Sequence, residues 1–290
     1  MLKALVDLRV DEDGLRRLRA LPDIQVDLVD KPEEESKRPL PAERLAGVQV
    51  LGCSLPPSNV GDMRALRFVQ IASAGYNQLV GLGLSERGVR ACNALGVFDV
   101  PIAEWNVAMM VNLLRDLRGM IRNQEQGVWD RDIRFQRELR GLTAGFWGYG
   151  GIARETARLT KALGMRVHVL ARNGVKSRAE VYRVPGTGDP GGNLPDRVFT
   201  MAQQEEFLGG LDFLVLAMPL TDASRGIIGE PELRALRPTA CLLNPARGPL
   251  IQEQALLRAL REGWIAGAAL DTHYQYPMPP EHPLWRLPNV

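Results

Sequence analysis

An arginine follows an apolar run in the segment LLNPARGPLIQ, residues 242–252. The run ends at Asn244, and Arg247 precedes Gly248 in the turn that follows. A guanidinium presents five N–H donors in a fixed fork that suits a carboxylate or a phosphate. The segment therefore predicts an anion site at the end of a buried strand. The alternative is a salt bridge that ties two parts of the chain together.

A glycine-rich turn lies in TAGFWGYGGIARETARLTKALGMRVHVLARN. Gly148, Gly150 and Ala153 form a GxGxxA arrangement between a strand-like run and a helical pattern that Gly164 is placed to end. The apolar face predicted for this helix consists of Ile152, Thr156, Leu159 and Leu163. Small residues let the backbone approach a pyrophosphate at the positive end of a helix. The pattern predicts a dinucleotide site, and a tight turn without a ligand is the alternative.

The residues after the next strand-like run bear on the choice of cofactor. An NAD site typically has an acidic residue there, which accepts a hydrogen bond from the ribose 2′-hydroxyl. Ala171 holds that place, and Arg172, Asn173, Lys176 and Arg178 follow. No carboxylate repels a 2′-phosphate, and Arg172 can pair with one in forked geometry. NADP(H) is the predicted cofactor, with NAD(H) possible, and a merely solvated basic loop is the alternative.

Alternating strands and helices must hold these turns. Strand-like runs occupy 3–8, 25–29, 48–53, 67–72, 142–147, 166–170, 212–218, 240–244 and 264–271. Helical patterns between them indicate parallel sheets built from βαβ units. The predicted fold is α/β, with two Rossmann-like or flavodoxin-like domains and a cleft between them. The domains are expected at 1–100 and 101–290, with a hinge near 96–102.

One long helix is predicted from Pro101 to Ile121, because proline suits the first helical position. Its polar residues indicate a buried or interface helix rather than a membrane span. Residues 31–39 are expected to form a charged surface loop, and the segment VPGTGDPGGNLP, 184–195, a flexible loop.

Composition excludes several classes of protein. With 45% apolar and 24% charged residues, the chain resembles a soluble globular protein. The net charge is +2 and the 36 Lys and Arg are dispersed, so nothing points to nucleic acid. Cys53, Cys92 and Cys241 are far apart, which argues against disulfides or a metal site and for a reducing compartment, the cytoplasm. The apolar run at the start is too short for a signal peptide.

Several segments together resemble the D-isomer-specific 2-hydroxyacid dehydrogenases. They are QIASAGYNQL, VPIAEWNVAMMVNLLRDLR, LDFLVLAMPLTDASRGIIG and NPARGPLIQEQALLRALREGWIAGAALD. The resemblance covers nearly the whole chain and is strongest from Thr143 onward. It implies an oxidoreductase that uses NADPH to reduce a small 2-keto acid of the glyoxylate or hydroxypyruvate kind, and a homodimer built on helix 101–121. A rival on the same fold is a non-catalytic dinucleotide-binding protein like the C-terminal binding corepressors.

The resemblance also implies roles for individual residues. Arg247 would hold the substrate carboxylate and polarise the 2-keto oxygen, and Asp271 would hold the nicotinamide carboxamide. The residues implied to offer backbone N–H groups to the substrate are Ser73, Ala74, Gly75 and Tyr76. Those implied for the cofactor are Gly148, Tyr149, Gly150, Gly151, Ile152, Arg172, Asn173, Met218, Pro219, Asn244, Ala246 and Asp271.

The chain departs from the family pattern near its end. Tyr276 stands where the family has a glutamate; it could hydrogen-bond to substrate, although a phenol is a reluctant acid–base group. The family's catalytic histidine lies a few residues beyond PNV, so that general acid and the helix completing the first domain are expected to be missing. Of the histidines present, His168 is expected to be packed or at the surface and His282 to be structural, while His273 could face the cleft.

Overall fold

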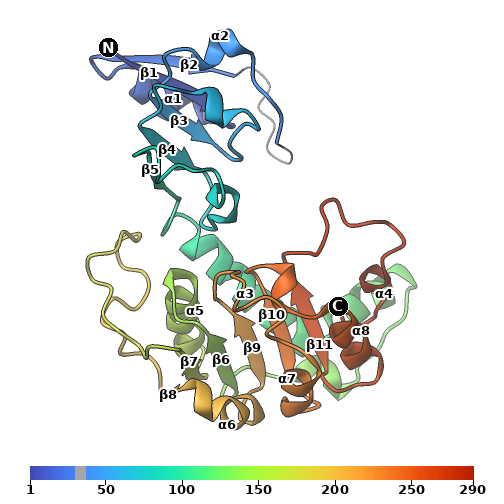
Figure 1. The fold of residues 1–290 in the computed structure, drawn as a ribbon. Helices are drawn as coiled ribbons and strands as arrows, with labels where there is room; N and C mark the ends of the chain where they lie inside the picture. Colours follow the sequence, from blue (N-terminus) through green and yellow to red (C-terminus); the bar gives the residue numbers. More distant parts are fainter. Residues whose placement is uncertain (30–36) are drawn as a thin grey trace. The chain divides into compact units, whose positions relative to one another are not determined.

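The computed structural model describes residues 1–29 and 37–290, so most of the predicted charged loop at 31–39 lies outside the described residues. The chain divides into two compact units, Met1–Leu95 and Gly96–Val290. Each unit contains its own parallel sheet (Figure 1). The two α/β folds expected from the alternating pattern are therefore confirmed, whereas the roles predicted for the two units stay predictions.

The first unit contains a five-stranded sheet in the order β2-β1-β3-β4-β5, with every pair parallel. Its elements are β1 (Leu2–Asp7), α1 (Glu12–Arg19), β2 (Ile24–Leu28), α2 (Ala42–Leu45), β3 (Val50–Cys53), η1 (Val60–Asp62), β4 (Phe68–Ile71), η2 (Asn77–Leu79) and β5 (Arg90–Cys92). This is the flavodoxin-like strand order. The sequence did not predict β5, because its three residues are all exposed and form no apolar run.

The second unit contains a six-stranded parallel sheet in the order β11-β10-β9-β6-β7-β8. Its strands are β6 (Thr143–Trp147), β7 (Arg166–Leu170), β8 (Arg197–Phe199), β9 (Phe213–Leu216), β10 (Cys241–Asn244) and β11 (Gly267–Leu270). Numbered from β6, this is the 3-2-1-4-5-6 order of a Rossmann fold. The order reverses between β6 and β9, and such folds bind ligands at the carboxyl ends of the strands beside this switch point.

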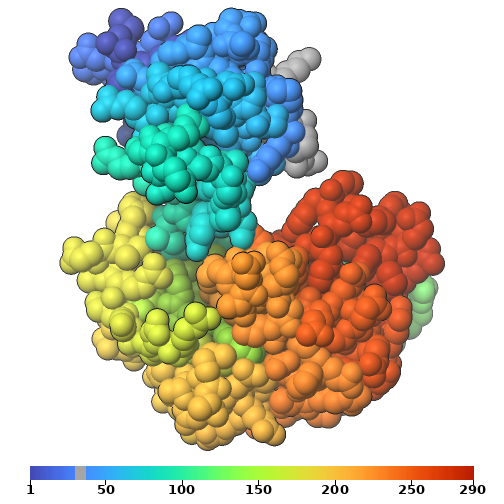
Figure 2. All heavy atoms as spheres, viewed as in Figure 1, coloured from blue at the N-terminus to red at the C-terminus, as the bar shows by residue number. Residues whose placement is uncertain are grey.

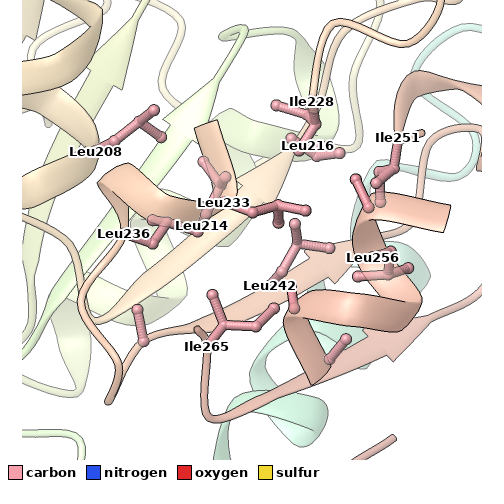
Figure 3. Packing of buried hydrophobic residues seen from close by; sticks show 14 of the residues in the cluster. Leu208, Leu214, Leu216, Ile228, Leu233, Leu236, Leu242, Ile251, Leu256 and Ile265 are labelled. Carbon is pink, nitrogen blue, oxygen red and sulfur yellow. The ribbon is translucent and has the colours of Figure 1, made fainter. Parts of the chain in front are cut away.

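Helices cover both faces of the second sheet (Figure 1). The helices are α3 (Asp99–Leu114), α4 (Leu117–Glu125), α5 (Gly151–Ala162), α6 (Gln204–Gly209), α7 (Glu230–Ala235) and α8 (Glu253–Arg261), and the short 3-10 turns are η3 (Ile133–Gln136), η4 (Met201–Gln203), η5 (Gly248–Leu250) and η6 (Pro283–Trp285). Side chains alternate along each strand, so Val215 joins the core under α3 and α5 while Leu214 and Leu216 join the opposite core. Figure 3 shows Leu214 and Leu216 in that opposite core beside Leu233 of α7 and Leu256 of α8.

The prediction of one long helix over 101–121 was wrong, because the chain forms α3 and α4 with a break between them. Asp116 takes a left-handed conformation with φ 46°, and its carboxylate accepts from the N–H of Gly119 at 3.1 Å. This short acidic side chain starts a new helix where the apolar pattern continues. The first helix also begins earlier than expected, at Asp99, although Pro101 still lies in the first turn, where no intrahelical N–H bond is lost. Among the described residues, no helix is long and apolar enough to cross a membrane.

The buried face of α5 matches the prediction fully only at Thr156, since Ile152 and Leu159 are half-buried. Leu163 is 43% exposed, whereas the small residues Ala153, Thr156, Ala157 and Thr160 are buried. Small side chains let α5 approach α3 closely, and Asn106 Nδ2 donates to Thr156 Oγ1 at 3.0 Å across this contact. The predicted end of the helix is confirmed, since Gly164 has φ 78° directly after it.

Candidate functional site

The glycine turn connects β6 to α5 at the point where the strand order reverses. Gly148 has φ 93°, and a Cβ built on it would lie 2.7 Å from the carbonyl oxygen of Ala217, which follows β9. Only glycine therefore fits this conformation and this close approach. Among the described residues, the N–H groups of Gly151 and Ile152 have no acceptor, and Gly150 provides no side-chain cap. The turn leaves an open helix N-terminus of the kind that binds anions.

The surroundings of this turn fit a dinucleotide. A Cβ on Gly150 would meet only the Nη1 atom of Arg178, at 3.7 Å, so the backbone can be approached closely. A side chain on Gly151 would overlap the carboxylate of Asp99, so glycine is needed there for a different reason. The backbone amides, the absence of a capping side chain and the nearby guanidinium suit a pyrophosphate.

Tyr149, in the middle of the motif, is tied to the loop predicted to be flexible. Its hydroxyl donates to Asp189 Oδ2 at 2.8 Å, and both residues are buried. Burial, reinforced by the bond to the Asp189 carboxylate, raises the pKa of Tyr149. Only the backbone of Tyr149 is therefore free to serve a ligand. The loop has no helix or strand, as predicted, but it is anchored at its centre.

Asp189 organises this loop. It is 6% exposed and accepts from the N–H groups of Gly192, Asn193 and Leu194 at 2.9, 2.9 and 3.0 Å. Burial alone would raise the pKa of Asp189, but these three bonds and the Tyr149 hydroxyl outweigh burial and lower it. This role of Asp189 was not predicted from the sequence. The available signal was that Asp189 is the only acidic residue in a segment dense in Gly and Pro.

A buried arginine on α5 completes the anchor. Arg154 is 4% exposed, and its guanidinium donates to the carbonyl oxygens of Tyr149, Asp189 and Lys176. The neighbouring Glu155 accepts from the N–H of Gly188 at 2.5 Å. The loop therefore packs against the helix that begins at the glycine turn. Figure 2 shows this part of the chain, in yellow, at the surface of the second unit.

The end of β7 lies beside this loop in the sequence. Arg172 and Asn173 are exposed in a turn, and Ala171 holds the place of the acidic residue. Within the described chain, the guanidinium of Arg172 makes no hydrogen bond or ion pair. The turn thus offers a free cation and no carboxylate where a ribose would lie.

The turn that carries Arg247 is held by Asn244, which is fully buried at the end of β10. Asn244 Oδ1 accepts from the N–H groups of Ala246 and Arg247 at 3.1 and 3.2 Å, and Nδ2 donates to the Arg247 carbonyl at 2.9 Å. Arg247 Nη1 donates to the Ala246 carbonyl at 2.7 Å. No carboxylate in the described part of the chain pairs with Arg247, so the salt-bridge alternative gains no support. Asn244 uses its side chain to shape the turn.

The segment after β11 packs on the same turn. A Cβ on Gly248 would overlap the backbone of His273, so glycine permits this contact. Tyr276 is 65% exposed, and its hydroxyl oxygen accepts from the His273 N–H at 2.9 Å, which leaves the phenolic proton free. Asp271 is exposed directly after the strand.

Other predicted residues occupy the ends of β9 and β7. After β9, Pro219 is exposed and Met218 half-buried, and Ser224 Oγ donates to the Pro219 carbonyl at 2.8 Å. His168 packs on Phe199 with ring centroids 5.4 Å apart, and His282 bonds Glu253 at 2.6 Å, as expected for structural histidines. Among the described residues, no group of three or more His, Cys, Asp or Glu could hold a metal ion.

The predicted substrate loop follows β4 in the first unit. Ser73 Oγ donates to the Gly75 carbonyl at 2.8 Å, and Asn93 Nδ2 donates to the Ala74 carbonyl at 2.6 Å. These bonds use the carbonyls of Ala74 and Gly75 as acceptors. The N–H groups of Ala74, Gly75 and Tyr76 have no acceptor among the residues that the structure describes. These backbone N–H groups could therefore donate to an anion such as a carboxylate.

Comparison with known proteins places the chain in a family. Residues 107–290, more than half of the chain, match the model of the D-isomer specific 2-hydroxyacid dehydrogenase, NAD binding domain. The chain therefore belongs to the D-isomer specific 2-hydroxyacid dehydrogenase family, which confirms the resemblance.

Relatives with named activities are similar over much of the chain. A glyoxylate reductase of Korarchaeum cryptofilum is 32% identical over 232 residues, which is 78% of this chain and 64% of that protein. A glyoxylate reductase of Thermococcus gammatolerans is 29% identical over 99% of this chain and 84% of its own length. The chain spans less than two thirds of several curated relatives, with 63% to 65% of their lengths covered.

Solved structures share the fold of nearly the whole chain. The TT0316 protein from Thermus thermophilus has a TM-score of 0.77 at 27% identity, covering 99% of this chain and 87% of that one. An NADPH-dependent glyoxylate/hydroxypyruvate reductase from Sinorhizobium meliloti has a TM-score of 0.77 at 23% identity, covering 100% and 87%. The second likeness is evidence for the fold alone.

Proposed function

We propose that this protein uses NADPH to reduce a small 2-keto acid of the glyoxylate or hydroxypyruvate kind. The observation that carries the proposal is the pair of turns at the carboxyl ends of β6 and β10 in one Rossmann sheet. One turn offers open amides for a dinucleotide, and the other offers an arginine without an acidic partner among the described residues. The family and the names of the relatives support this assignment.

The proposed roles follow from charge and geometry. A bound reduced nicotinamide would supply the hydride to the keto carbon. The fork of Arg247 binds the substrate carboxylate and stabilises the negative charge that develops on the keto oxygen. Asp271 accepts from the carboxamide, and Ser73 to Tyr76 give backbone N–H groups to the carboxylate. Tyr276 hydrogen-bonds to substrate through its free proton, since its oxygen already accepts from His273.

A turnover assay tests this proposal against a binding protein that does not consume cofactor. The loss of NADPH absorbance is followed with glyoxylate and then with hydroxypyruvate. Substrate-dependent oxidation with saturation is expected. Tight cofactor binding without oxidation by any 2-keto acid would instead favour the non-catalytic corepressor-like function.

A preference for NADPH over NADH is part of the proposal. Arg172 has no acidic neighbour at the end of β7 and can bind the 2′-phosphate. A charged hydrogen bond of this kind contributes about 1.5–3 kcal/mol, so NADPH should bind roughly 10- to 150-fold more tightly. Fluorescence titration measures both affinities. Equal affinities for NADPH and NADH would show that Arg172 is solvated and does not bind the 2′-phosphate.

We also propose a homodimer through α3, α4 and the segment after them. Four large apolar side chains of these segments expose between 41% and 89% of their surface: Val111, Ile121, Trp129 and Ile133. An exposed apolar surface of this kind is typical of a protein–protein interface. Light scattering should give about twice the 32.1 kDa chain mass, and a species of the single-chain mass at micromolar concentration would contradict it. The three free thiols suit a reducing compartment such as the cytoplasm.

A further inference from the structure

Two opposite charges beside the N-terminus of α5 lack hydrogen-bond and ion-pair partners in the part of the chain that the structure describes. Asp99 is 7% exposed, and its carboxylate lies against Gly151, where a side chain would otherwise be. Arg178 is half-buried, with Nη1 close to Gly150. Within the described residues, neither side chain makes a hydrogen bond or comes within 4.0 Å of an opposite charge. The guanidinium of Arg178 lies beside the helix N-terminus, whose Gly151 and Ile152 N–H groups have no acceptor among the described residues, so the two together suit an anionic ligand.

The backbone holds Arg178 at this position. Its N–H donates to the carbonyl of Pro190 at 2.8 Å, and Ser177 Oγ donates to the same oxygen at 3.2 Å. Pro190 directly follows Asp189, the buried anchor of the loop. The bonds that order the loop therefore fix the backbone of Arg178 while leaving its guanidinium unused.

The charge of Asp99 explains why an unused cation stays near the glycine turn. Burial raises the pKa of Asp99, while the positive charge of Arg178 acts in the opposite direction and Glu155 adds to the effect of burial. The carboxylate and the guanidinium thus attract each other through space without forming an ion pair. A ligand that brings its own negative charge can take over the guanidinium.

We propose that Arg178 binds the pyrophosphate of the dinucleotide, together with the amides of Gly151 and Ile152. This inference rests on the proposed function, because it assumes that a dinucleotide binds at the glycine turn. Gly150 and Gly151 have no side chains that could bind a phosphate. The loop after β7 supplies the guanidinium of Arg178 from outside the motif. Arg172 remains for the ribose 2′-phosphate, so two arginines bind two different phosphate groups.

The test compares two cofactors that share a pyrophosphate and differ in the 2′-phosphate. Binding of NADPH and NADH is titrated by tryptophan fluorescence for the native protein, Arg178→Ala and Arg172→Ala. Arg178→Ala is expected to weaken both cofactors by the same factor, about 10- to 100-fold, as for loss of a charged hydrogen bond. Arg172→Ala is expected to weaken NADPH alone. Arg178→Lys should recover part of the loss, because it keeps the charge without the fork.

The matched control is Lys176→Ala, which removes an exposed cation from the same loop and should leave both affinities unchanged. Thermal unfolding of Arg178→Ala should match the native protein, because its guanidinium makes no bond within the described chain.

Three other results of the cofactor titrations would lead to different conclusions. If the native protein binds both cofactors and Arg178→Ala binds them equally well, the inference is overturned and the proposed function stands. If Arg178→Ala loses affinity for NADPH only, the arginine binds the 2′-phosphate and the pyrophosphate assignment is wrong. If the native protein binds neither cofactor, the proposed function itself fails.

Discussion

The turn after β10 and the turn after β6 each place a cation at the carboxyl end of a strand, and they are built in opposite ways. Around Arg247, one buried side chain, Asn244, makes three hydrogen bonds to the backbone of Ala246 and Arg247. Around the glycine turn, the charged groups come from the start of α3 and from a loop after β7. The first turn is shaped by its own sequence, and the second is assembled from distant segments.

The two turns differ in which of their polar groups are already bonded within the protein. The Arg247 turn has its backbone polar groups bonded to Asn244, so its shape does not depend on a ligand. At the glycine turn, the polar groups of the anchor, Tyr149, Arg154 and Asp189, are bonded, while Asp99 and Arg178 beside them have no partners among the described residues. A support whose polar groups are bonded thus carries one guanidinium, that of Arg178, which an anionic ligand would neutralise.

The largest expected effect comes from removing the cation that the locally built turn carries. Arg247→Ala should lower kcat/KM for glyoxylate by roughly 10²- to 10³-fold, as for loss of one group that stabilises a developing oxyanion. Cofactor affinity should stay within about twofold, because the glycine turn is built independently. Steady-state rates and fluorescence titration measure the two effects. An equal loss of NADPH affinity would show that the two turns are not independent.

A second experiment releases the anchor of the assembled turn. Asp189→Asn replaces a carboxylate that accepts four hydrogen bonds, so the free energy of unfolding at pH 7 should fall by about 3 kcal/mol. Because folding lowers the pKa of Asp189, its stabilisation is present above the unfolded-state value, about pH 4, and is lost as the pH falls through the folded value. Denaturant unfolding of both proteins between pH 7 and pH 3 should therefore converge at the acid end.

The control for this experiment is Asp222→Asn, the same chemical change at an exposed position. It should leave stability unchanged at every pH. A difference between Asp189→Asn and the native protein that persists undiminished in acid would mean that the carboxylate charge is not what orders the loop.

The matching change in the locally built turn is Asn244→Leu. Two backbone N–H groups and one carbonyl would lose their partner, at a cost of about 2 kcal/mol, which corresponds to a fall in Tm of roughly 4–8 °C. Calorimetry measures this shift. Asn173→Leu, at an exposed asparagine, should leave Tm nearly unchanged. If both variants melt like the native protein, the bonds of Asn244 are not what shapes the turn.

The smallest expected effect concerns the sign of the charge at the glycine turn. Ionised Asp99 opposes an incoming pyrophosphate, so Asp99→Asn should strengthen NADH binding by about 2- to 5-fold at pH 8, the scale of one partly screened charge. Because burial raises the pKa of Asp99, native affinity should fall as the pH rises through that value. NADH is the probe because it lacks the 2′-phosphate, which itself titrates at about pH 6.

In Asp99→Asn, the affinity for NADH should not fall as the pH rises, because the titrating carboxylate has been removed. Weaker binding by Asp99→Asn would show that the carboxylate helps to hold the ligand. Arg178 and Glu155 are the charged groups that affect the pKa of Asp99. Glu155→Gln therefore serves as a comparison in which a neighbouring negative charge is removed while Asp99 is kept.

Short-range patterns predicted much of the second unit. Gly148 and Gly164 have the left-handed conformations that their places between strand and helix require. The apolar runs correspond to β6, β9 and β10 because strands buried on both faces read as continuous hydrophobic segments, while Val167, Val169 and Leu170 mark β7. The strands β5 and β8 were missed because most of their residues are exposed, so they have no apolar run to recognise.

The alternating fold, the glycine turn and the place of Arg247 could be predicted from local sequence, because each depends on residues within a few positions of one another. Only the tertiary structure decided that α3 ends before Asp116, that α5 buries its small residues, and that Asp189 anchors a loop to the glycine motif. The reason is physical: Tyr149 and Asp189 are 40 positions apart, and a bond between them exists only after the sheet has brought their segments together. No periodicity in a linear sequence reports such a contact, since periodicity records which side of an element is buried and not which partner covers it.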